Sequence, residues 1–298
     1  MVGLRLLFVS LLLMTNAANL HAQSTDSTNT FKPKRFTALA TTAGVTYTGS
    51  LVLLGSIWYT DQLSTNFKFF NDDSEWRGMD KIGHMYTSFH VSNAAVRVLK
   101  WTGSSRKKSI LFGGFTGAAL MIPIEILDGF SDDYGFSWGD VAANTSGSIL
   151  VVTQHLLWDE IRITPKFSYH ETGYADMRPN TLGSTTMQRF IKDYNGQTYW
   201  LSFNIASLAH LERFPKWLNV SVGYGAEEML YALPSENSDH GYHSYAKGLL
   251  SLDIDFNRIK TKHAFLRGLF RGLNMLHVPF PALEYNGRNG FQFHPLYF

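Results

Sequence analysis

The sequence predicts an α+β fold, in which a mainly α, membrane-associated four-helix bundle precedes a smaller C-terminal region rich in antiparallel strands. Two observations predict it. Before residue 160, long runs without charged residues alternate with polar pairs spaced three or four residues apart, as on one face of a helix. Beyond Pro165 the sequence becomes aromatic and rich in turn residues, and apolar residues alternate with polar ones at the period of a strand.

The N-terminal segment predicts export. An arginine, an apolar run over 6–14 and small residues ending at Ala22 form the pattern of a cleavable secretory signal. We expect residues 1–22 to be this signal and residues 23–35 to be a flexible polar tether. The 298 residues contain no cysteine, so they offer no disulfide, no thiolate ligand and no cysteine for lipid attachment. We therefore expect a periplasmic protein that associates with a membrane through the polypeptide itself.

Residues 36–160 are expected to form the four helices of the bundle. The first, over 36–60, has no charged residue and exceeds the roughly 20 residues that a bilayer crossing requires. The second, over 82–101, is amphipathic, whereas the third (109–124) and the fourth (141–158) again lack charged residues.

The charges between these helices bear on membrane topology. Four crossings from an exported N-terminus would leave the basic cluster at 106–108 outside and the acidic loops in the cytoplasm. This arrangement opposes the rule that positive loops stay inside. We therefore expect a bundle that faces the periplasm and lies against a membrane.

Polar residues mark the ends of the predicted helices as three pairs: Asp80 with His84, Glu125 with Asp128, and Asp140 with Asn144. In an up-and-down bundle with short connections these ends share one side. Burying such side chains in an apolar environment costs several kcal/mol unless they meet partners. The sequence thus predicts that the pairs form one shared polar site.

Roles can be assigned to the members of this site. We predict acid–base roles for His84, Glu125, Asp80 and Asp140, ligand contacts for Lys81, Asp128 and Asn144, and no bound metal. Structural roles are the competing interpretation, because Asp80 is placed to cap a helix and Ser137-x-x-Asp140 matches a capping box. His84 and Asn144 could likewise serve only as interior hydrogen-bonding groups. Glu125 follows an apolar run and a proline, so it needs a partner, for which Lys81 or His84 is the nearest cation.

Other site types have weaker support. The acidic turn with Asp128, Asp132 and Asp133 suggests a divalent cation, but its spacing does not match an EF-hand loop and a solvated turn is favoured. No zinc-type histidine spacing, phosphate loop or nucleophile elbow is present in the sequence. A net charge of +2 without an arginine-rich tract argues against nucleic-acid binding. We therefore predict no cofactor and no nucleic-acid partner.

The C-terminal region over 161–298 is expected to contain at least three antiparallel strands. Apolar residues alternate with polar or small ones over 199–205, 218–224 and 250–256. A basic amphipathic helix is expected near 262–277, either on a membrane surface or as an ordinary surface helix.

The polar segments also carry a resemblance. The stretches DKIGH at 80–84, EILDG at 125–129 and SWGDVAANTSG at 137–147 resemble the YfiM-like family of predicted periplasmic proteins and lipoproteins of unknown function. More distantly, their order is similar to that in VanZ-like membrane proteins, which are linked to glycopeptide resistance. The resemblance implies an envelope protein and implies no particular reaction.

Together these patterns predict an envelope protein with a binding or support role in lipid or cell-wall metabolism. Its partner would be membrane lipid or a lipid-linked cell-wall intermediate. One alternative is a membrane-associated hydrolase or transferase acting on a lipid-linked or phosphorylated envelope substrate, with His84 or Glu125 as general acid or base and Lys81 pairing with a phosphate. The other is a purely structural envelope protein.

Overall fold

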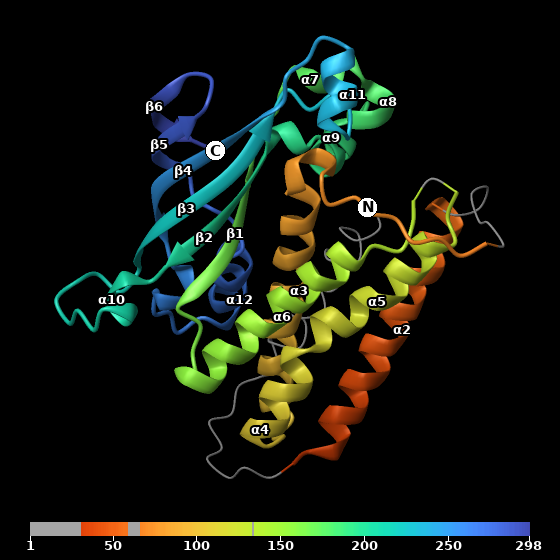
Figure 1. Cartoon of the computed structure of the whole chain (residues 1–298). Helices are drawn as coiled ribbons and strands as arrows, with labels where there is room; N and C mark the ends of the chain where they lie inside the picture. Colours follow the sequence, from red (N-terminus) through yellow and green to blue (C-terminus); the bar gives the residue numbers. More distant parts are fainter. Residues whose placement is uncertain (1–30, 59–65, 133) are drawn as a thin grey trace. The chain divides into compact units, whose positions relative to one another are not determined.

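The computed structural model of the chain describes residues 31–58, 66–132 and 134–298 (Figure 1). The predicted signal over 1–22 and most of the predicted tether lie outside these residues. The described chain confirms the α+β class, because helices fill its first part and an antiparallel sheet its C-terminal part.

The chain divides into two compact units. We call residues up to 72 together with 84–160 the helical unit, and residues 73–83 together with 161–298 the sheet unit. Helix α3 belongs partly to each, because it runs without a break from Met79 to Trp101.

The described part of the helical unit is built from long helices: α2 (Pro33–Trp58), α3, the consecutive segments α4 (Arg106–Lys108), η2 (Ser109–Gly113) and α5 (Thr116–Gly129), and α6 (Trp138–Leu157). Helix α2 begins at a proline, whose fixed φ suits a first helical turn. It is attached to α5 by the Tyr47 hydroxyl, which donates to the Leu120 carbonyl oxygen at 2.7 Å. Tyr47 and Leu51 also pack on buried Met121 and Ile124 of α5.

A membrane bundle of four spanning helices is not confirmed. Among the described residues one helical stretch, Arg106–Gly129, is long and apolar enough to cross a membrane by length and composition alone. The crossing expected over 36–60 is not among such stretches, although α2 is helical through most of that range. Its threonine, serine and glycine residues dilute its hydrophobicity, because each replaces an aliphatic side chain.

The sheet unit contains six strands in the order of the sequence, each antiparallel to its neighbours. Their bounds are β1 (Ile163–Tyr169), β2 (Gln197–Phe203), β3 (Leu218–Glu227), β4 (Tyr245–Ile254), β5 (Phe280–Asn286) and β6 (Gly290–Tyr297). Figure 1 shows them side by side as one twisted layer. Short helices connect them: α7 (Tyr174–Met177), α8 (Pro179–Leu182), α9 (Thr186–Lys192), α10 (Ile205–Leu208), α11 (Pro234–Asp239) and α12 (Ala264–Leu273). Short 3₁₀ turns complete the unit: η1 (Glu75–Gly78), η3 (Tyr194–Gly196) and η4 (Phe256–Arg258).

The buried face of this sheet is unusually polar. Lys166 and Asp253 form a fully buried ion pair with Nζ and Oδ2 2.6 Å apart, and Lys247 pairs with Glu227 at 2.6 Å. Burial lowers the pKa of Lys166, while the Asp253 carboxylate acts in the opposite direction. Beside these pairs lies a small apolar cluster formed by Trp200, Leu249, Ala282 and Tyr297. Because buried charges are tolerated only when paired, this face depends on these ion pairs.

The opposite face of the sheet is apolar and exposed. In β4, for example, the side chains from Ala246 to Asp253 alternate between exposed and buried, and Leu250 and Leu252 point outward. The exposed large apolar residues on β3 to β6 and at the C-terminus are Val222, Leu250, Leu252, Leu283, Tyr285, Phe291, Phe293, Leu296 and Phe298. A soluble antiparallel sheet usually has the reverse polarity, with its apolar face covered.

His277 is a buried titratable group of the sheet unit. Its imidazole stacks on the Trp200 ring with centroids 3.8 Å apart. Both of its ring nitrogens are buried. Burial therefore penalises the charged form and lowers the pKa of His277 to about 4.

This pKa predicts a pH dependence of stability. As pH falls below 6.5, the unfolded chain binds a proton at His277 but the folded chain does not, down to about pH 4. Proton binding therefore favours the unfolded chain, so the free energy of unfolding is unaffected by this group above pH 6.5 and decreases as pH falls towards 4. The loss by pH 4 should be roughly 2–3 kcal/mol. Urea unfolding of the purified chain at several pH values measures it. His277→Phe keeps a ring against Trp200 and removes the titration, so its stability should fall less steeply; equal slopes for both chains would contradict the assignment.

Candidate functional site

A cluster of buried polar side chains surrounds His84 in the helical unit. His84 comes from α3, Glu125 from α5, and Asp140 and Asn144 from α6. All four are buried, with Glu125 only 1% exposed. The structure thus brings together one member from two of the predicted pairs and both members of the third. We call these four residues the polar centre.

The two nitrogens of the His84 imidazole face different partners. Nδ1 lies 3.3 Å from Asn144 Oδ1 and 3.4 Å from Glu125 Oε1. The Asn144 amide in turn donates from Nδ2 to Glu125 Oε1 at 3.4 Å. Nδ1–H therefore has two acceptors on one side of the ring. A carboxylate and an amide placed in this way fix the orientation of an imidazole and favour the tautomer protonated on Nδ1.

On the other side of the ring, Nε2 faces Asp140, with Asp140 Oδ1 at 3.6 Å. This separation is too long for a hydrogen bond. Two buried carboxylates, Glu125 and Asp140, therefore flank one imidazole, whose protonation supplies at most one positive charge.

The two helix starts show which residues act as caps. Ser137 is the N-cap of α6, and its hydroxyl accepts from the Asp140 backbone N–H at 3.2 Å. The cap is therefore the Ser137 side chain, and the Asp140 carboxylate lies beside His84. Asp80 is the second residue of α3 rather than the residue before it, so it lies within the first turn.

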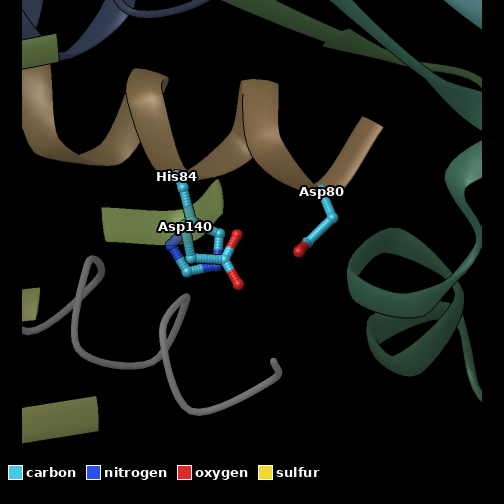
Figure 2. Close-up of side chains that lie close together, drawn as sticks. All are labelled: Asp80, His84 and Asp140. Carbon is cyan, nitrogen blue, oxygen red and sulfur yellow. The ribbon is translucent and has the colours of Figure 1, made fainter. Parts of the chain in front are cut away.

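Asp80 lies on the same face of α3 as His84, one turn earlier. Figure 2 shows both side chains projecting from one side of this helix, with the Asp140 carboxylate against the imidazole ring. Each of the three residues offers a ligand atom, and these atoms all lie within 4.8 Å of one another. Within the sheet unit, the Tyr194 hydroxyl donates to Asp80 Oδ1 at 3.0 Å and Lys81 Nζ lies 3.5 Å from Oδ2.

The other two predicted site residues lie at the start of α3 and at the end of α5. Lys81 pairs with its neighbour Asp80 and is largely covered. Asp128 is half-buried in the last turn of α5, three residues after Glu125. The ligand roles assigned to both stay predictions. Asp132 is exposed, and Asp133 lies outside the described residues.

Serine side chains that the sequence interpretation passed over continue the polar centre along the helices. The Ser148 hydroxyl lies 3.0 Å from that of Ser88 and 2.9 Å from that of Ser92. Ser92 and Ser148 accept from the backbone N–H groups of Gly117 and Ala118 at 2.9 and 3.0 Å. They satisfy first-turn donors of α5, whose N-cap residue Phe115 has no side-chain acceptor.

These serines had a signal in the sequence. His84, Ser88 and Ser92 follow one another at four-residue intervals on α3, and Asn144 and Ser148 do so on α6. Extending the spacing of the polar pairs would have placed them on the same helical faces.

Close helix approach depends on two glycines. A Cβ on Gly117 of α5 would overlap the carbonyl oxygen of Ser88, and a Cβ on Gly147 of α6 would overlap that of Met85. Both obstacles are backbone atoms of α3, which cannot turn away as a side chain can. The glycines therefore allow α5 and α6 to approach α3 closely enough for the polar side chains to meet.

Comparison with known families indicates the cellular location of the chain. Residues 68–156 match the model of a family described as predicted periplasmic lipoprotein (DUF2279). All four residues of the polar centre lie within this range. No curated protein and no solved structure matches the chain. The family match supports an exported, periplasmic protein of the cell envelope.

The glycine packing makes a testable prediction. Gly147→Ala should destabilise the helical unit by roughly 1–3 kcal/mol, because the added methyl group forces α6 away from α3. Gly44→Ala is the matched control, since Gly44 lies in α2 with nothing within 4 Å of its Cβ position. There the change should stabilise by about 0.5–1 kcal/mol through helix propensity. Thermal or urea unfolding compares the two, and equal effects would contradict the close packing.

Proposed function

We propose that this chain is a cell-envelope protein that binds a small polar ligand at the polar centre and contacts a lipid membrane through its sheet unit. Its role would be binding or support in lipid or cell-wall metabolism. The observation that carries the proposal is the convergence of His84, Glu125, Asp140 and Asn144, from three helices, in the interior of the helical unit. The match to a family of predicted periplasmic lipoproteins supports a location in the cell envelope.

Burial favours binding of a small ligand over catalysis on a large one. The side chains of His84 and Glu125 are 5% and 1% exposed. A lipid-linked substrate would need the helices to separate before its scissile bond reached the imidazole. An ion or another compact polar group needs far less space.

One feature supports the alternative of a hydrolase or transferase. A carboxylate, Glu125, and an amide, Asn144, hold the His84 imidazole by Nδ1, which is how a general base is commonly oriented. Nε2 would then exchange a proton with the substrate. This alternative requires an open form of the helical unit.

The membrane contact rests on the exposed face of the sheet. Val222, Leu250, Leu283 and Phe293 are consecutive cross-strand partners on β3, β4, β5 and β6. They are 51%, 50%, 42% and 67% exposed. Tyr285 and Phe291 form an adjacent exposed pair across β5 and β6. The result is a continuous apolar surface across four strands.

The reversed polarity of the sheet favours lipid as the occupant of this surface. Strands that face lipid carry apolar residues outward and polar residues inward. This sheet has the same arrangement, because the ion pairs Lys166–Asp253 and Lys247–Glu227 are on its covered side. A continuous apolar surface of this kind gains free energy when it leaves water.

Vesicle flotation tests the membrane contact. The double substitution Leu283→Ser and Phe293→Ser should greatly reduce cosedimentation or flotation with phospholipid vesicles, because it places hydroxyl groups in the middle of the apolar row. Met187→Ser is the control, since Met187 is equally apolar and exposed but lies on α9. Light scattering in detergent tests the other occupant, a second copy of the chain. A dimer that the double substitution dissociates, with vesicle binding unchanged, would overturn the lipid contact.

Complementation of a deletion strain tests the polar centre. His84→Ala and Glu125→Gln should abolish rescue of envelope defects while circular dichroism and export stay unchanged. His90→Ala is the control, because His90 is also buried on α3 but packs edge-on against the Tyr86 ring. Full rescue by both folded variants would overturn the proposed binding role.

The enzyme alternative has its own measurement. Purified protein is assayed with and without EDTA against phospholipids and undecaprenyl phosphates. Turnover that Glu125→Gln abolishes would replace the binding role by catalysis. Inactivity on every substrate would leave the binding role as the account of the polar centre.

A further inference from the structure

We propose that the polar centre binds a transition-metal dication, with His84 Nε2 and the carboxylates of Asp140 and Asp80 as its ligands. This inference rests on the proposed function and names the ligand of the same site. It differs from the sequence-based expectation, which assigned these residues acid–base roles and no metal.

The distances suit a shared cation better than direct contact. His84 Nε2 and Asp140 Oδ1 are 3.6 Å apart, beyond hydrogen-bonding distance. Two ligand atoms held about 2.1 Å from one tetrahedral metal lie about 3.4 Å apart. The observed separation is therefore close to the edge of a coordination polyhedron. A ligand atom of Asp80 lies within 4.8 Å of both, a distance that a carboxylate rotation can shorten.

Helical spacing explains how the ligands come together. Asp80 and His84 are four residues apart on the continuous helix α3, so both project from one face. Asp140 lies in the first turn of α6, where the Ser137 side chain rather than the Asp140 carboxylate caps the helix.

The other two members of the polar centre support the imidazole from behind. Metal-binding histidines commonly donate their second ring N–H to a carboxylate or an amide oxygen, which fixes the tautomer and the ring orientation. Glu125 Oε1 and Asn144 Oδ1 occupy this position, at 3.4 and 3.3 Å from Nδ1. They lie on the side of the ring away from Asp140, so they orient His84 without occupying Nε2.

The charge of a dication suits these ligands. Asp80 and Asp140 are both buried carboxylates, and a dication bound by both would balance the two negative charges that it touches. The imidazole would bind as the neutral ring, with Nδ1–H directed at Glu125 and Asn144.

The ligand types indicate the class of metal. An imidazole nitrogen favours zinc and other first-row transition metals, whereas magnesium and calcium prefer oxygen ligands alone. Three protein ligands leave a coordination position for water or for an anionic group.

Metal titration of the purified chain tests this inference. The protein is stripped with EDTA, dialysed against Zn²⁺ or Mn²⁺ and analysed for bound metal by mass spectrometry and by the shift in melting temperature. The wild type should retain one equivalent and melt at a higher temperature. His84→Ala and Asp140→Asn should lose the retained equivalent, and Glu125→Gln should weaken binding roughly 10–100-fold. His90→Ala, on the same helix, should bind as the wild type does.

The outcomes separate this inference from the proposed function. No retained metal and no thermal shift in the wild type would overturn the metal site, as would retention that His84→Ala and Asp140→Asn leave unchanged. If complementation still required His84 in that case, the polar centre would stand with another ligand. Specific metal binding together with full rescue by the His84 variant would instead overturn the proposed function and leave the metal site in place.

Discussion

The helical unit depends on one constraint: ionisable and amide side chains buried among apolar helices must satisfy one another. Glu125 follows an apolar run of α5 and is almost completely covered, so its carboxylate needs donors inside the unit. Asn144 and His84 supply them from α6 and α3. The three helices are thereby held in one register, because sliding any of them by a turn would separate these groups.

Two serines and two glycines also help these buried side chains to meet. Ser92 and Ser148 bond to the start of α5 and so determine its height relative to α3 and α6. Gly117 and Gly147 remove the Cβ atoms that would keep the backbones apart. Polar contacts of modest individual strength can then form, since hydrogen bonds weaken steeply with distance and misalignment.

The sheet unit follows a related principle with different residues. Its covered face holds Lys166 against Asp253 and Lys247 against Glu227, while its apolar face is exposed. Specific pairing rather than a large apolar core holds that covered face. Loss of one partner from such a pair is expected to cost about 3–5 kcal/mol, because the other charge stays buried.

Local patterns carried most of what the sequence predicts. The α+β class follows from periods of 3.6 and 2, which are properties of neighbouring residues. The spacing of Asp80 with His84 and of Asp140 with Asn144 indicated which side chains share a helical face. Alternation in Leu250 and Leu252 defined two faces of β4, but it does not say which face the rest of the chain covers.

Local patterns cannot predict features that are formed by two elements far apart in the sequence. The proposed metal ligands, for example, come from α3 and α6, whereas recognised zinc motifs place paired ligands close together in sequence. The membrane crossing predicted for 36–60 stays a prediction, because among the described residues α2 has the length of a spanning helix but does not reach its hydropathy. The stretch Arg106–Gly129 combines both properties.

The most direct measurement of the central claim is a double-mutant cycle between His84 and Glu125. Urea unfolding gives the free energies for the wild type, His84→Ala, Glu125→Ala and the double variant. If the two side chains satisfy each other in the interior, each single substitution leaves the other polar group buried without this partner. The loss in the free energy of unfolding of the double variant should then be at least about 1 kcal/mol smaller than the sum of the two single losses. Strict additivity of the two losses would contradict the account.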